Sequence, residues 1–117
     1  MVYTIGTARE IPSLPCILPQ SVRKELLRCT ATLDREYGED RNYHQTGGYS
    51  VIVETKEDVS GIMPTLNFDT HFPEWVDRFG DYAAALYLLN DDFSVVLFVP
   101  LEIAPKAILN ELEEELK

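Results

Sequence analysis

The side chains best suited to chemistry in this sequence lie in a short segment past its midpoint. Seven consecutive positions hold Asp69, His71, Glu74 and Trp75, the last being the only tryptophan of the chain. A histidine beside a carboxylate can work as a general acid or base near neutral pH. Two histidines among 117 residues are easily placed there by chance, so the favoured interpretation is a loop whose tryptophan anchors the core.

A second group of candidates surrounds Tyr43 and His44, in a polar loop that spans residues 39–48. Arg35 and Arg41 lie close by in the sequence, and arginine and aromatic side chains are enriched at protein interfaces. The loop could therefore form a recognition surface, although structural aromatics of a turn are the favoured interpretation. The two groups together define one candidate pocket: Tyr43, His44, Asp69, His71, Glu74 and Trp75.

The remaining motifs predict no catalytic residue, no metal and no cofactor. Cys16 and Cys29 lie thirteen positions apart, and zinc would need them to converge with His44 and His71 from separate segments. Gly47-Gly48 precedes a predicted strand rather than a helix, which is typical of a turn and is the wrong order for a phosphate-binding loop. Cys29 falls on the apolar stripe of a predicted helix, so a buried thiol is expected there.

Negative charge is concentrated in the second part of the chain. The net charge is −10; residues 1–45 hold six acidic and six basic side chains, and residues 46–117 hold fourteen and four. This distribution disfavours nucleic acids and anionic membranes, which require clustered Lys and Arg. It permits a basic protein partner, although solubility alone is a simpler explanation. The candidate partner-binding residues are Asp91, Asp92, Glu111, Glu113, Glu114 and Glu115.

Local signals predict the elements that position these residues, beginning with an arm and a helix. Residues 1–18 are expected to form an extended, Pro-rich arm that starts with a short strand, because closely spaced prolines block a helix. Residues 19–37 are expected to form a helix that starts at Pro19 and ends before Gly38. Its apolar residues recur every three or four positions: Val22, Leu26, Cys29, Leu33 and Tyr37.

Residues 49–99 are expected to be mostly strands. After a strand over 49–54, Thr55 and Asp58 could cap a short helical turn, and residues 66–68 are a candidate edge strand. The apolar runs 82–89 and 93–99 flank a turn signal, which predicts a β-hairpin, although the Ala-rich first run could be helical. A final helix is predicted over 104–116.

Together these elements predict one α+β domain over residues 1–117. No crossover helix separates the later strands, so an antiparallel sheet of four or five strands is expected, with two helices packed on one face. The hairpin strands are apolar on both faces, unlike strands that have one face in water. The second face is therefore expected to be covered by the Pro-rich arm or by a second copy of the chain in a homodimer.

The sequence narrows the setting and leaves three functional hypotheses. It shows no secretory signal and no apolar stretch long enough to cross a membrane, so a cytoplasmic protein is expected. The leading hypothesis is a non-enzymatic interaction protein, of an inhibitor, immunity or accessory type, that binds a basic protein partner. The alternatives are a DNA-mimic inhibitor of a nucleic-acid enzyme and a small acid/base enzyme that uses His71 or His44 with a nearby carboxylate.

Overall fold

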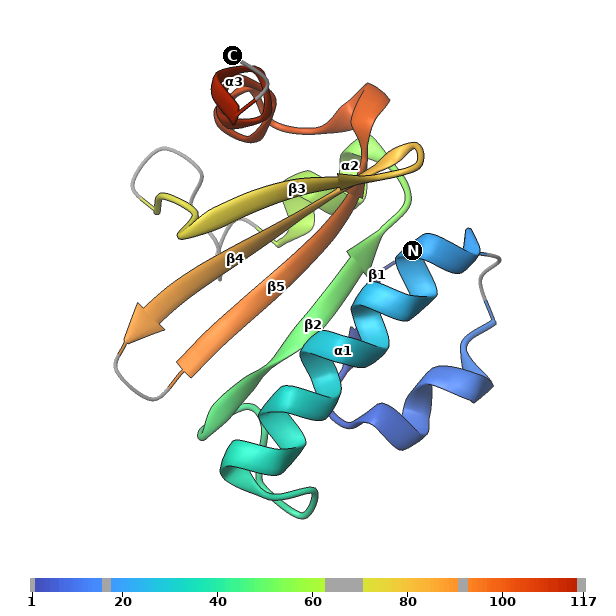
Figure 1. The fold of residues 1–117 in the computed structure, drawn as a ribbon, viewed down its shortest axis with the longest axis vertical. Helices are drawn as coiled ribbons and strands as arrows, with labels where there is room; N and C mark the ends of the chain where they lie inside the picture. Colours follow the sequence, from blue (N-terminus) through green and yellow to red (C-terminus); the bar gives the residue numbers. More distant parts are fainter. Residues whose placement is uncertain (1, 16–17, 63–70, 91–92, 116–117) are drawn as a thin grey trace.

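A five-stranded sheet with helices on both sides forms the frame of the molecule (Figure 1). The computed structural model describes residues 2–15, 18–62, 71–90 and 93–115. In chain order the elements are β1 Val2–Ile5, the 3₁₀ helix η1 Ala8–Ser13, α1 Gln20–Tyr37, β2 Gly47–Val53, α2 Lys56–Gly61, β3 Trp75–Phe79, β4 Tyr82–Asn90, β5 Phe93–Pro100, the 3₁₀ helix η2 Leu101–Ile103 and α3 Lys106–Glu115.

The sheet is mixed, and the prediction of a wholly antiparallel sheet is wrong at one pair. The strand order is β1-β2-β5-β4-β3, and β2 runs parallel to β5 while the other three pairs are antiparallel. A parallel pair needs a long crossover connection, and here that connection contains α2, β3 and β4. The β4–β5 hairpin itself is confirmed, and the Ala-rich run is a strand rather than a helix.

The two long helices lie on opposite faces of the sheet, so the prediction that they share one face is also wrong. The front face, toward the viewer in Figure 1, packs against α1. The back face packs against α2 and α3, with Ile108 of α3 fully buried. Both faces of β4 and β5 are therefore covered at least in part by helices of the same chain. This accounts for strands that are apolar on both sides.

The N-terminal arm lies on the front face with α1 rather than across the back. Ile11 and Leu18 are buried there beside Val22 and Leu26 of α1. The arm is not extended throughout, because residues 8–13 form η1. Pro12 is tolerated in this 3₁₀ helix because so short a segment needs few backbone hydrogen bonds.

The local signals for α1 and α2 are confirmed. Pro19 is the N-cap of α1, and Gly38 ends that helix with φ of 93°. The Oγ1 atom of Thr55 accepts a hydrogen bond from the Asp58 N–H at 3.2 Å, which caps α2. Gly47-Gly48 begins β2 instead of forming a separate turn. The candidate edge strand 66–68 lies outside the described residues.

Candidate functional site

The front face of β3 and β4 is the part of the described sheet that α1 leaves most open. The helix lies over β1, β2 and β5, where its apolar stripe packs against Ile5, Ile52 and Phe98. On β4 the front side chains become more accessible only beyond the fully buried Ala84: Leu86 is half-buried and Leu88 is 55% exposed. Figure 1 shows the sheet twisting so that β4 and β3 diverge from the helix. An apolar surface is left facing solvent beside α1.

Two adjoining hollows between α1 and this surface form what we call the front groove. The first hollow measures about 200 Å³ and the second about 530 Å³, and both are bordered by Arg28 and Trp75. The first has a mainly apolar wall made by Cys29, Leu33, Trp75, Leu86 and Val96, with Arg28, Thr32, Glu36 and Ser94 as its polar residues. The second is lined by Glu25, Arg28, Trp75, Val76, Asp77 and Phe79.

Strand register explains why Trp75 reaches the groove. Trp75 pairs with Leu86, and Leu86 pairs with Val96 on the next strand. Paired residues point to the same face, so these three side chains form one row across the front of the sheet. Trp75 is half-buried against the core cluster under α1. Trp75 is thus the first residue of β3 and lines the groove. The sequence had instead predicted a loop in which the tryptophan anchors the core.

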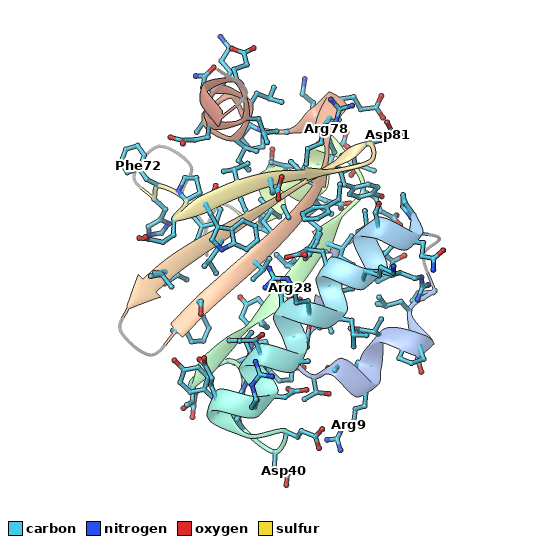
Figure 2. All side chains as sticks on the ribbon, viewed as in Figure 1. Arg9, Arg28, Asp40, Phe72, Arg78 and Asp81 are labelled. Atoms are coloured by element: carbon cyan, nitrogen blue, oxygen red, sulfur yellow. The ribbon has the colours of Figure 1, made fainter. Side chains whose placement is uncertain are left out.

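Charged side chains from α1 and β3 line the groove. Arg28 Nε donates to both carboxylate oxygens of Glu25, at 2.9 and 3.0 Å, and this hydrogen bonding raises the pKa of Arg28. Figure 2 shows Arg28 on the side of α1 that looks toward the open strands. Within the described part of the chain, Asp77 and Glu36 form no ion pair. Three carboxylates, Glu25 and Glu36 of α1 and Asp77 of β3, and one guanidinium, that of Arg28, therefore line the two hollows.

Cys29 lines the first hollow, and its environment suppresses thiol reactivity. Burial, followed by the negative charge of Glu25, raises the pKa of Cys29 to about 12. Because the thiolate is the reactive form, iodoacetamide at pH 8 is expected to alkylate Cys29 at least tenfold more slowly than an unfolded-chain thiol with a pKa near 8.5. The measurement uses a Cys16→Ser variant, with the same variant in denaturant as the control. Equal rates in the two conditions would contradict the buried placement.

The other candidate pocket residues are divided between the two faces of the sheet. The His44 ring packs at a tilt of 42° against Tyr43, with the ring centroids 4.6 Å apart, and lies 5.5 Å from the ring of Tyr49, which in turn contacts Phe93. Tyr49 and Phe93 belong to the back-face core, opposite Trp75. The structure therefore does not unite Tyr43 and His44 with Trp75 in a single pocket. The sequence missed this division because the position of each group depends on strand pairing, which joins residues far apart in the sequence.

The remaining members of the predicted His and carboxylate segment lie around the start of β3. His71 is half-buried and Glu74 is exposed, and the Glu74 N–H donates to the Leu86 carbonyl at 2.7 Å. Asp69 lies outside the described residues. Neither histidine lines the front groove. Of the described residues of this predicted segment, Trp75 lines the groove, and His71 and Glu74 do not.

The predicted acidic partner-binding residues are only partly described. Glu111 and Glu113 are exposed on α3, which packs on the back of the sheet away from the groove. Asp91 and Asp92 lie outside the described residues, as do the side chains of Glu114 and Glu115. The carboxylates that do line the front groove were not singled out from the sequence. A helical spacing of three and four residues from Glu25 through Arg28 and Thr32 to Glu36 was the available signal.

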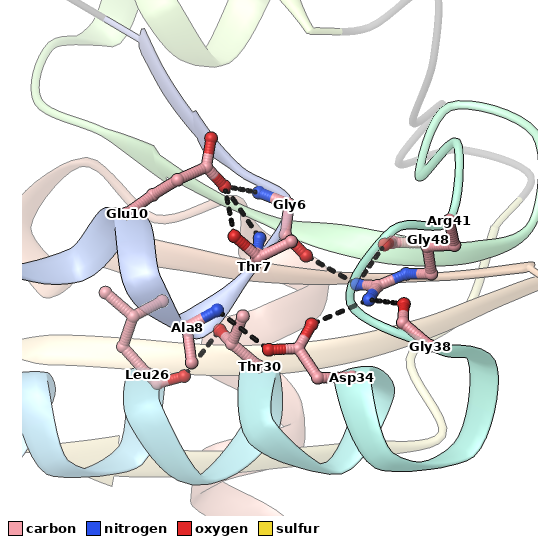
Figure 3. Close-up of polar contacts among 10 residues, drawn as sticks. All are labelled: Gly6, Thr7, Ala8, Glu10, Leu26, Thr30, Asp34, Gly38, Arg41 and Gly48. Atoms are coloured by element: carbon pink, nitrogen blue, oxygen red, sulfur yellow. Dashed lines mark hydrogen bonds and ion pairs between the residues drawn. The ribbon is translucent and has the colours of Figure 1, made fainter.

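A buried ion pair was also missed by sequence reasoning. Arg41 Nη1 lies 2.7 Å from Asp34 Oδ1, and their side chains are 1% and 8% exposed. Figure 3 shows Arg41 also donating to the carbonyls of Gly6, Gly38 and Gly48, while Asp34 Oδ2 accepts from the Ala8 N–H. This cluster joins the arm, α1 and the start of β2. Arg41 is therefore a structural residue rather than part of an exposed recognition loop.

Similarity to known proteins assigns no function to this chain. No protein-family model, curated protein or solved structure matches the chain. Among the described residues, His, Cys, Asp and Glu side chains do not gather in threes that could hold a metal ion. The described helices are each too short or too polar to span a membrane.

Proposed function

We propose that this protein is a non-enzymatic interaction module that binds a segment of a basic partner protein in the front groove. The observation that carries the proposal is the apolar front surface of β3 and β4 that α1 leaves open, with Leu88 55% exposed at its end. Leu88 pairs with Ser94, a residue of the first hollow, so the exposed leucine continues the groove. We propose that this binding takes place in the cytoplasm.

The shape and chemistry of the groove support peptide binding. Interface centres combine an apolar wall with aromatic anchors and a polar rim. Here Trp75 and Leu86 form the wall, and Glu36 and Asp77 provide rim charge. The net charge of −10 on the whole chain would accelerate association with a positively charged partner through long-range attraction.

Selection of Trp-free random dodecapeptides displayed on phage tests the proposal. Trp75 is the chain's only tryptophan and borders both hollows, so its fluorescence reports binding of each selected peptide directly. Leu88→Lys is expected to weaken binding by at least about tenfold, because it removes apolar contact area and places a cation next to the first hollow. Affinity is also expected to fall as salt rises from about 0.05 to 0.5 M.

Leu27→Lys is the matched control, because Leu27 is a leucine of α1 with 49% exposure that, unlike Leu88, is not next to a groove residue in the strand pairing. It makes the same chemical change and should leave the affinity within about twofold. Equal losses in the two variants, or no selected peptide, would contradict the proposal. A dimer of the protein alone that Leu88→Lys dissociates and Leu27→Lys does not would assign the groove to a second copy instead.

A further inference from the structure

The second hollow of the front groove combines features that suit a basic side chain. Trp75, Asp77 and Phe79 alternate along β3, so their side chains point to the same face, with a carboxylate between two aromatic rings. Aromatic faces attract ammonium and guanidinium groups, and a carboxylate within reach adds a charge-assisted hydrogen bond to the same cation. Glu25 of α1 borders the hollow on the opposite side.

The charges of this hollow are arranged so that Asp77 can accept a further cation. Arg28 is bound by both carboxylate oxygens of Glu25, which offsets its positive charge. Asp77 Oδ1 accepts the backbone N–H of Arg78 at 2.8 Å, and within the described residues its carboxylate forms no ion pair. The Arg78 side chain instead donates from Nε to the Gly80 carbonyl. Asp77 thus retains free acceptor capacity at the groove.

The first hollow differs in character and suits an apolar side chain. Leu33, Leu86 and Val96 supply aliphatic walls, and the protonated thiol of Cys29 adds no charge. Its volume of about 200 Å³ is enough for one aliphatic or aromatic side chain. Because Arg28 and Trp75 border both hollows, the two sites are neighbours. An extended segment places residues i and i+2 on one side, about 7 Å apart.

We infer that the front groove recognises a two-residue signature, an aliphatic or aromatic side chain in the first hollow and a Lys or Arg within two positions of it in the second. This inference rests on the proposed function and specifies the chemistry of the occupant. Asp77 is the specificity-determining residue for the basic position, and Trp75 contacts both side chains.

Positional analysis of the selected dodecapeptides tests this signature. Lys or Arg is expected within two positions of a shared apolar residue, and replacing that basic residue with alanine should weaken binding by about 5- to 20-fold, the combined effect of an ion pair and a cation–π contact. Asp77→Asn, which preserves side-chain shape, should reduce this penalty to about threefold or less.

Asp40→Asn is the matched control, since Asp40 is exposed and lies in Figure 2 at the end of the molecule far from the open strands. It makes the same change in net charge, so it should leave the alanine penalty unaltered. Selected peptides that bind in the groove without a basic residue would overturn the inference and leave the proposed function standing. A penalty that Asp77→Asn does not reduce, or that both variants reduce equally, would overturn it as well. Failure to select any peptide would overturn both.

Discussion

Replacing Asp34 with asparagine is expected to lower the free energy of unfolding by about 3–5 kcal/mol. The substitution keeps the shape of the side chain but leaves the Arg41 guanidinium, 1% exposed, without its counter-charge. An uncompensated buried charge costs far more than an exposed one because water cannot solvate it. The Asp34 contact to the Ala8 N–H is weakened at the same time, so the arm is also loosened.

Urea unfolding followed by Trp75 fluorescence measures this effect. Glu25→Gln provides the comparison on the same helix, since it disrupts a pair whose Arg28 side chain is 62% exposed and should cost only about 0–1 kcal/mol. Adding Arg41→Met to Asp34→Asn should cost less than the sum of the two single changes, because the double variant leaves no buried charge unpaired. A loss from Asp34→Asn no larger than that from Glu25→Gln would show that the Arg41 site is solvated.

The second large effect is expected from Gly48→Ala, with a loss of about 3 kcal/mol or more in unfolding free energy. Gly48 has φ of 112°, a conformation that residues with a side chain rarely adopt. A Cβ atom there would also lie 1.7 Å from the Ser94 carbonyl oxygen on β5. The parallel pair of β2 and β5 would have to separate to admit it.

Substitutions at two other glycines separate the backbone strain of Gly48→Ala from its steric contact with Ser94. Gly38→Ala meets no atom within 4 Å but has φ of 93°, so it should cost only the conformational strain, about 1–2 kcal/mol. Gly61→Ala, at the end of α2, has open space and no positive φ, and should stabilise by about 0.4–1 kcal/mol. Chemical denaturation of all three variants gives the comparison. If Gly48→Ala lowers the free energy of unfolding only as much as Gly38→Ala, the separation of β2 from β5 would cost no free energy.

Elements whose signals are local could be predicted from the amino-acid sequence. The helix stripe from Val22 to Leu33 and the cap residues Pro19 and Gly38 act within a few positions, so α1 was predicted closely. The Thr55 and Asp58 capping pair of α2 and the apolar strands of the β4–β5 hairpin were also predicted from signals within a few positions. Apolar side chains on both faces of β4 and β5 also required cover on both sides, which α1 on the front and α2 and α3 on the back provide in part.

For the groove, the sequence offered only Trp75 and the general acidity. Trp75 was singled out because it is the only tryptophan and sits among polar residues. Its neighbours in the site, Leu86 and Val96, look like ordinary strand residues, and only the register of β3, β4 and β5 aligns them. Arg28 and Asp77 likewise come from segments almost fifty residues apart.

The placement of the strands and helices relative to each other depends on long-range contacts and could not be predicted from local signals. The pairing of β2 with β5, the opposite placement of α1 and α3 and the burial of Arg41 against Asp34 all join distant segments. Such contacts are selected by the total burial and hydrogen bonding of the assembled chain, which no short window of sequence contains. The open front of β3 and β4 has the same origin, because α1 packs where β1, β2 and β5 bring their apolar side chains together.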